Sequence, residues 1–169
     1  MRYLLLLPIV YVAAVLETSA VDLIGVGRVA PDLLAMVAII WLMIVPTPRA
    51  FLVAGGIVLV GDLIAPGRPG VGMAWMLLIG YAITRLQQHV KMDHLAVQVI
   101  VLWAAVTLWA SAVGFTGRLT GHVVSPWSTL FVHTAGVGIY TAGVSLPVLM
   151  VIGWIREPLL TRQARMTEF

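Results

Sequence analysis

Six apolar segments, separated by short connections rich in proline and glycine, dominate the sequence. They run over residues 3–21, 31–46, 49–65, 71–87, 95–115 and 129–154. A straight helix needs about 20 apolar residues to cross the core of a bilayer, with a range near 17–25. Only 10% of the residues are charged, whereas soluble domains carry about 25%. The pattern predicts an all-α, polytopic integral membrane protein with one transmembrane domain over residues 1–169.

The number of spans is less certain than the membrane class, because the second, third and fourth segments are at or below the short end of that range. These segments either cross a thin bilayer or lie inside the bundle, or one of them is re-entrant. Five spans are therefore an alternative to six. The first segment has the features of a secretory signal, but Pro8 and Glu17 interrupt it and more apolar segments follow. We expect it to be retained as the first helix.

The basic residues predict the orientation of the six-span arrangement. With the N-terminus in the cytoplasm, seven arginine and lysine residues lie inside and three lie outside, as the positive-inside rule requires. The inside set is Arg2, Arg49, Arg85, Lys91, Arg156, Arg162 and Arg165, and the outside set is Arg28, Arg68 and Arg118. Residues 155–169 then form a short basic cytoplasmic tail, and both termini are cytoplasmic.

Two aspartates mark helix ends on the predicted outer side. Asp32 begins the second helix just after Pro31, which suits the first turn, and the positive end of the helix dipole accounts for an acid there. Asp62 ends the third helix, where the dipole disfavours an anion, so water, Arg68 or Arg28 must compensate its charge. A structural salt bridge and a contact with a partner or ligand are both open for Asp62.

Glu17 and Asp22 belong to the same outer zone, which therefore holds four acids and three arginines. A charge cluster at a membrane surface is usually solvated and paired within itself. It is also suited to dock the extracytoplasmic domain of a partner. Both interpretations stay open.

Motifs for catalysis, cofactors and metals are lacking. The chain has no cysteine and no His-x-x-x-His pair, so neither a thiolate site nor a helical histidine site for a metal is expected. It also has no nucleophile elbow, phosphate-binding loop or dinucleotide fingerprint. The basic residues are too few and too scattered for nucleic acid. We expect a protein that is not an enzyme and uses no cofactor, metal or nucleic acid.

Small residues recur at four-residue spacing, which permits close approach of two helices. The pairs are Ala50 and Ala54, Ala110 and Gly114, and Gly138 and Ala142. They serve either packing within the chain or a groove for the single transmembrane helix of a partner.

Several short motifs follow one another in an order typical of one known family. "PDLL" (31–34) opens the second helix, and the glycine-bearing "FLVAGGIVLVGDL" (51–63) ends in an acid. The loop "APGRPGVG" (65–72) leads into a helix ending in "YAITRL" (81–86), and "IYTAGVSLPVL" (139–149) precedes the basic tail. In this order and length the chain resembles the rod shape-determining protein MreD family.

The resemblance implies a non-enzymatic subunit of the bacterial inner membrane, within the elongation (rod) complex that governs cell shape and lateral peptidoglycan synthesis. It implies association with an MreC-like bitopic protein. The wider assembly comprises an MreB-like filament, a RodA-like glycosyltransferase and a class B penicillin-binding transpeptidase. The family is also thought to share a six-helix fold with the substrate-binding subunits of energy-coupling-factor transporters. We expect the partner contacts to involve Pro31, Asp32, Asp62, Arg68 and Gly70.

The loop departs from the usual family turn by an extra Pro66-Gly67-Arg68 element and by Val71 in place of leucine. Two other functions therefore stay open. A vitamin-binding subunit of an energy-coupling-factor transporter needs a polar cavity near the outer leaflet. Its candidate residues are Asp32, Asp62, His122 and His133. An aspartyl lipoprotein signal peptidase needs two facing aspartates in asparagine-rich motifs, and this chain contains no asparagine.

Overall fold

The protein is all-helical throughout the residues that the computed structural model describes, as the sequence predicts. These residues are 2–19, 30–45, 47, 49–64, 70–89, 94–121 and 126–166, and side chains are described only between residues 6 and 154. The helices are α1 (Arg2–Ser19), α3 (Leu33–Ile44), α4 (Ala50–Ile64), α5 (Val71–Leu86), α6 (Leu95–Leu119) and α7 (Trp127–Met166).

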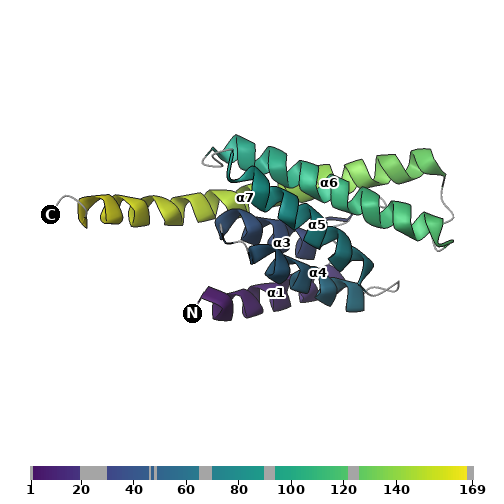
Figure 1. Ribbon diagram of the computed structural model, residues 1–169, viewed down its shortest axis with the longest axis horizontal. Coiled ribbons are helices and arrows are strands. Elements are labelled where there is room, and N and C mark those ends of the chain that lie inside the picture. The colour runs from purple at the N-terminus through teal and green to yellow at the C-terminus, as the bar shows by residue number, and fades with distance from the viewer. Residues whose placement is uncertain are drawn as a thin grey trace.

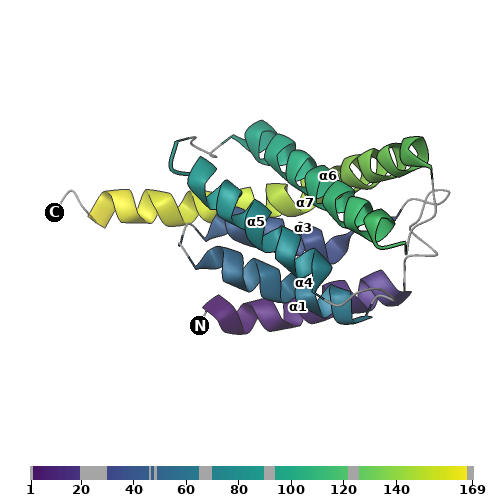
Figure 2. The same cartoon turned by 45° about the vertical axis from the view of Figure 1, so that its right-hand side comes forward.

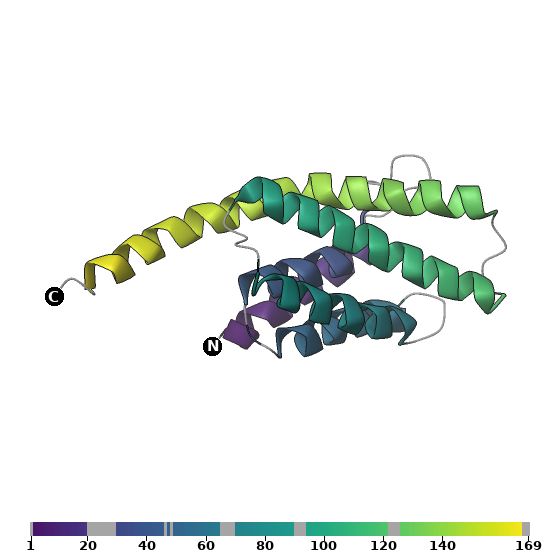
Figure 3. The ribbon, with the colours of Figure 1, turned by 45° about the horizontal axis from the view of Figure 1, so that its top comes forward.

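Successive helices run in opposite directions, and both chain termini lie at the same end of the bundle (Figure 1). We call this the terminal end; α3 and α5 finish there and α4 and α6 begin there. At the opposite end, the far end, α1, α4 and α6 finish and α3, α5 and α7 begin (Figure 2). The long pair α6 and α7 lies along one side of the four shorter helices (Figure 3).

Helix α3 is the centre of the fold. Ten of its 12 residues are buried, and it contacts each of the other five helices. At 1.5 Å per residue it is about 18 Å long, well below the roughly 30 Å of a bilayer core. Protein rather than lipid surrounds it, which agrees with the expectation that a short apolar segment lies inside the bundle.

Helices α6 and α7 have the length and hydropathy to cross a membrane, over Leu95–Leu119 and Trp127–Trp154. Both differ from the expected bounds, since α6 continues past residue 115 and α7 begins before residue 129. Helix α7 also continues to Met166, so most of the predicted basic tail is helical and projects beyond the bundle (Figure 1).

Large apolar side chains cover the outside of the helices. Leu7 is 68% exposed, Tyr11 71%, Val132 74% and Trp154 84%. So many exposed large apolar side chains are unusual on a soluble monomer and are expected where a protein meets lipid or a partner. The two long apolar helices and this surface indicate association with a membrane.

The small residues at four-residue spacing pack within the chain. Ala50, Ala54 and Ala142 are buried. A β-carbon at Gly114 would lie 3.0 Å from Leu130, and one at Gly138 would overlap the hydroxyl of Thr107. These positions let α6 approach α7 and place α4 inside the fold, whereas Ala110, the partner of Gly114 in its pair, is half-buried and lines a cavity described below.

Candidate functional site

The far end brings together the three carboxylates whose side chains the structure describes. They are Glu17 near the end of α1, Asp32 just before α3 and Asp62 near the end of α4. Glu17 and Asp32 repel each other electrostatically, as do Asp32 and Asp62. Each accepts hydrogen bonds from backbone N–H groups at a helix N-terminus. The helix dipoles therefore offset the repulsion.

Two of these carboxylates cap α3. Oδ1 of Asp32, the N-cap residue, accepts from the N–H of Ala35 at 2.7 Å, and Oε2 of Glu17 accepts from the N–H of Leu34 at 3.0 Å. Two of the N–H groups that an isolated helix leaves unpaired are thus satisfied. Helix α3 begins at Leu33, so Pro31 and Asp32 both precede the first turn, and the expectation that Pro31 lies in it is wrong.

The N-terminus of α3 is also tied to the middle of α7. The backbone N–H of Asp32 donates to Oγ1 of Thr141 at 3.1 Å, and Thr141 is fully buried. This bond crosses from the α1–α3 connection to the second long helix. The bond fixes the position of α3 along the axis of α7.

Backbone N–H groups at the start of the next helix, α5, compensate the negative charge of Asp62. Its Oδ2 accepts from the N–H of Gly70 at 3.1 Å and from the N–H of Met73 at 3.0 Å. Gly70 is the N-cap of α5, so the last turn of α4 supplies the capping side chain that glycine lacks. The anion thus lies at the positive end of α5. Arg28 and Arg68, the compensating residues expected from sequence, lie outside the described residues.

Two glycines make this cap possible. Gly70 has φ +93°, in the left-handed region that glycine adopts without strain. At Gly72 a β-carbon would overlap Oδ1 of Asp62. Gly72 was not among the predicted site residues, although "GVG" (70–72) after an acid and a proline-rich loop was available as a signal.

Among the outer arginines, Arg118 is the one that the structure describes. Its guanidinium carbon lies 4.3 Å from the ring centroid of Trp127, a cation–π contact between the end of α6 and the start of α7. Thus Arg118 packs on an aromatic ring, and the described carboxylates bond to backbone N–H groups. Asp22 and His122, the other members expected at this end, lie outside the described residues.

A cavity of about 680 Å³ opens beside Glu17 and Asp32. It lies between the start of α3 and the pair α6 and α7, whose contributions include Trp109, His133 and Thr134. Two acids, a histidine and two threonines line one space whose wall is otherwise largely apolar. Such a cavity fits a small molecule that combines apolar surface with a positive or hydrogen-bonding group.

A groove of about 590 Å³ separates α5 from α6. We call it the α5–α6 groove; twelve apolar side chains line it and no charged one does. They are Trp75, Leu78, Ile79, Ala82, Ile83, Leu86, Ile100, Val101, Ala104, Ala105, Leu108 and Ala112. Its composition fits an apolar helix or an acyl chain.

The predicted partner-contact residues lie in different settings. Pro31 is buried, whereas Asp32, Asp62 and Gly70 are half-buried at the far end and Arg68 lies outside the described residues. The bonds of Asp32 and Asp62 are internal, and a contact of either residue with a partner remains a prediction. Across the described part of the chain, no three histidine or acidic side chains are placed to hold a metal ion.

Comparison with known proteins does not assign a family. No family model matches the chain, and no curated protein or solved structure matches it.

Proposed function

We propose that this protein is a non-enzymatic membrane scaffold, similar to MreD, that binds the single transmembrane helix of an MreC-like partner in the bacterial inner membrane. Such a subunit would act in the elongation complex that controls cell shape and lateral peptidoglycan synthesis. The resemblance of its sequence motifs to that family supports the proposed function, and the α5–α6 groove supports the proposed binding mode.

The groove supports this proposal through its length and composition. On α5 the lining residues run from Trp75 to Leu86 and on α6 from Ile100 to Ala112, at spacings of three and four that keep one face of each helix. This stretch is about 16–18 Å along each helix. Ala82, Ala104 and Ala105 form small-residue positions at which a third helix approaches closely.

A helix is the favoured occupant because of what packing in lipid requires. Association of helices in a bilayer depends on close van der Waals contact, which small side chains permit. No charged side chain lines the groove, so a partner helix would not have to neutralise one. The internal small-xxx-small pairs are already used by α4, α6 and α7.

Affinity purification of the full chain from native membranes tests the proposal. We expect one single-span protein with an extracytoplasmic domain to co-purify, together with elongation-complex enzymes at lower yield. Recovery of the chain alone after in-membrane crosslinking would contradict the scaffold role.

A second candidate function is the vitamin-binding subunit of an energy-coupling-factor type transporter, favoured by the cavity that Glu17, Asp32 and His133 line. A thermal shift with a vitamin panel tests it on the purified chain. Ala110→Phe fills the cavity and should remove any shift, whereas Ala96→Phe, exposed at the start of α6, should keep it. A shift that both variants retain would contradict binding in this cavity.

A further inference from the structure

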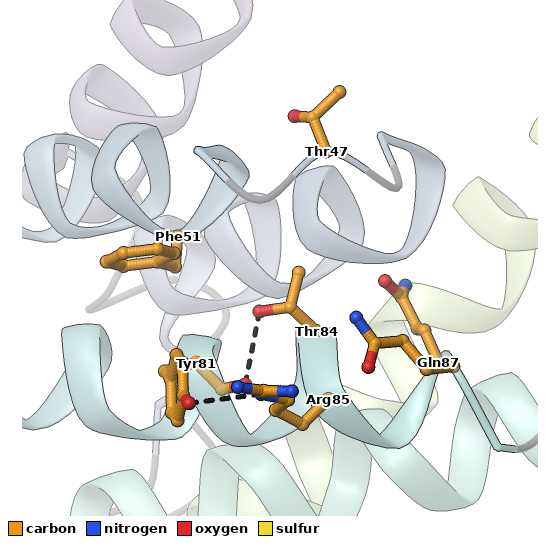
Figure 4. A pocket seen from close by; sticks show the side chains of 7 residues that line it. Thr47, Phe51, Tyr81, Thr84, Arg85 and Gln87 are labelled. Atoms are coloured by element: carbon orange, nitrogen blue, oxygen red, sulfur yellow. Dashed lines mark hydrogen bonds between the residues drawn. The ribbon is translucent and has the colours of Figure 1, made fainter.

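A second cavity with polar side chains in its lining, of about 410 Å³, lies at the terminal end of the bundle. It opens between the α3–α4 connection and the last turns of α5 (Figure 4). Its lining comprises Thr47, Phe51, Tyr81, Thr84, Arg85, Gln87 and Gln88. Neither the partner-helix proposal nor the cavity at the far end makes use of these residues.

Arg85 is held in place by Tyr81. Its Nε–H donates to the Tyr81 hydroxyl oxygen at 3.0 Å, and its guanidinium carbon lies 5.4 Å from the Tyr81 ring centroid (Figure 4). Phe51 packs edge-on against the same ring, with centroids 6.2 Å apart. The two terminal nitrogens of Arg85 have no hydrogen-bond partner among the described residues. The N–H groups on these two nitrogens can donate two parallel hydrogen bonds, which is the geometry in which arginine binds phosphate oxygens.

Gln87 supplies a second, independent observation. Its Nε2 donates to the carbonyl oxygen of Leu42 at 2.8 Å, which fixes the side chain against the end of α3. The other amide atom, Oε1, is buried and has no hydrogen-bond partner among the described residues. A buried acceptor without a donor is unfavourable, so a ligand that brings an O–H or N–H group would complete it.

The charges favour an anion at this end. Among the described side chains, the far end holds three acids and one arginine (Glu17, Asp32, Asp62 and Arg118), whereas Arg49 and Arg85 lie at the terminal end. In a membrane-embedded bundle, the helix ends lie at the depth of lipid headgroups, where basic pockets between helices bind anionic lipid.

We propose that this cavity binds the phosphodiester of an anionic lipid headgroup, with Arg85 holding phosphate oxygens and Gln87 Oε1 accepting from a headgroup hydroxyl. Phosphatidylglycerol has both groups. Phosphatidylcholine has a phosphate but neither a net negative charge nor a donor. The proposal depends on membrane embedding and is independent of the partner helix.

The test is direct binding of short-chain phosphatidylglycerol to the full chain in neutral detergent, with phosphatidylcholine and inorganic phosphate as separate arms. We expect Arg85→Gln to weaken phosphatidylglycerol binding about tenfold, since it removes a charge-assisted hydrogen bond. Tyr81→Phe keeps the charge and loses the acceptor that orients it, so about threefold weaker binding is expected. Arg49→Gln, an exposed arginine at the same end outside the cavity lining, is the matched control and should bind normally.

Unchanged phosphatidylglycerol binding in Arg85→Gln would overturn the proposal. An equal loss in Arg49→Gln would also overturn it, because only general surface charge would then be involved. Inorganic phosphate that binds as tightly as the lipid, with the same dependence on Arg85, would overturn the assignment to a headgroup.

Discussion

The carboxylate of Asp62 occupies the space that a side chain at residue 72 would need, and Gly72 leaves that space open. From this position Asp62 bonds to the N–H groups of Gly70 and Met73. An acid at the unfavourable end of one helix thereby becomes the cap of the next. The relationship joins α4 to α5 through backbone N–H groups.

Gly72→Ala should destabilise the protein by about 1–3 kcal/mol, because the new methyl group displaces the carboxylate and leaves two N–H groups unpaired. Thermal or denaturant unfolding in detergent measures the change. Gly56→Ala is the matched control: its β-carbon meets no atom within 4 Å. It should stabilise α4 by about 0.5–1 kcal/mol through the lower flexibility of the unfolded chain. Destabilisation by Gly56→Ala alone would contradict this account.

Asp62→Ala should cost about 0.5–2 kcal/mol, the range for loss of a helix cap. Unfolding of the isolated chain measures it, and partner co-purification separates the two roles of Asp62. Asp62→Asn keeps an acceptor oxygen and should retain much of the stability. If Asp62→Asn is stable yet loses the partner, Asp62 is a contact residue. If co-purification is unchanged in both variants, the contact role is wrong.

Thr141→Val should cost about 1–3 kcal/mol, since the backbone N–H of Asp32 loses its acceptor inside the bundle. Thr141→Ser keeps the hydroxyl and should cost less than the valine variant. The same unfolding measurement compares the two. A larger loss in the serine variant than in the valine variant would mean that packing of the methyl group, rather than the bond to Asp32, holds α3 against α7.

Ala104→Leu should reduce partner recovery several-fold, because a larger side chain fills the α5–α6 groove without adding charge. Ala96→Leu makes the same change at an exposed position earlier on α6, outside the groove, and should leave recovery unchanged. Quantified co-purification from native membranes measures both variants. A matching loss in Ala96→Leu would place the effect outside the groove.

The helical class and the order of the apolar segments followed from hydropathy alone, because burial in lipid or protein needs long apolar runs. The ends of α6 and α7 could not be predicted from hydropathy. Residues 116–119 and 155–166 are polar enough to indicate loops, yet they continue as helix. Helix length depends on packing and on solvent at the helix end, which composition does not encode.

The grouping of Glu17, Asp32 and Asp62 at one end was predictable from alternating helix directions. Their hydrogen-bond partners were not. The sequence pairs an acid most readily with an arginine, whereas these acids bond to N–H groups exposed by the start of another helix. Such capping across a loop depends on tertiary geometry. Gly72 was overlooked for the same reason, because only the position of Asp62 makes it necessary.

The central claim, that a partner's transmembrane helix occupies the α5–α6 groove, is tested most directly by site-specific photocrosslinking in native membranes. A photoreactive residue replaces Leu78, which lines the groove and is 61% exposed, or Val132 on α7, which is 74% exposed and outside it. The account predicts a crosslink to one single-span protein from position 78 and none from position 132. Equal crosslinking from both positions, or crosslinking only from position 132, would contradict it.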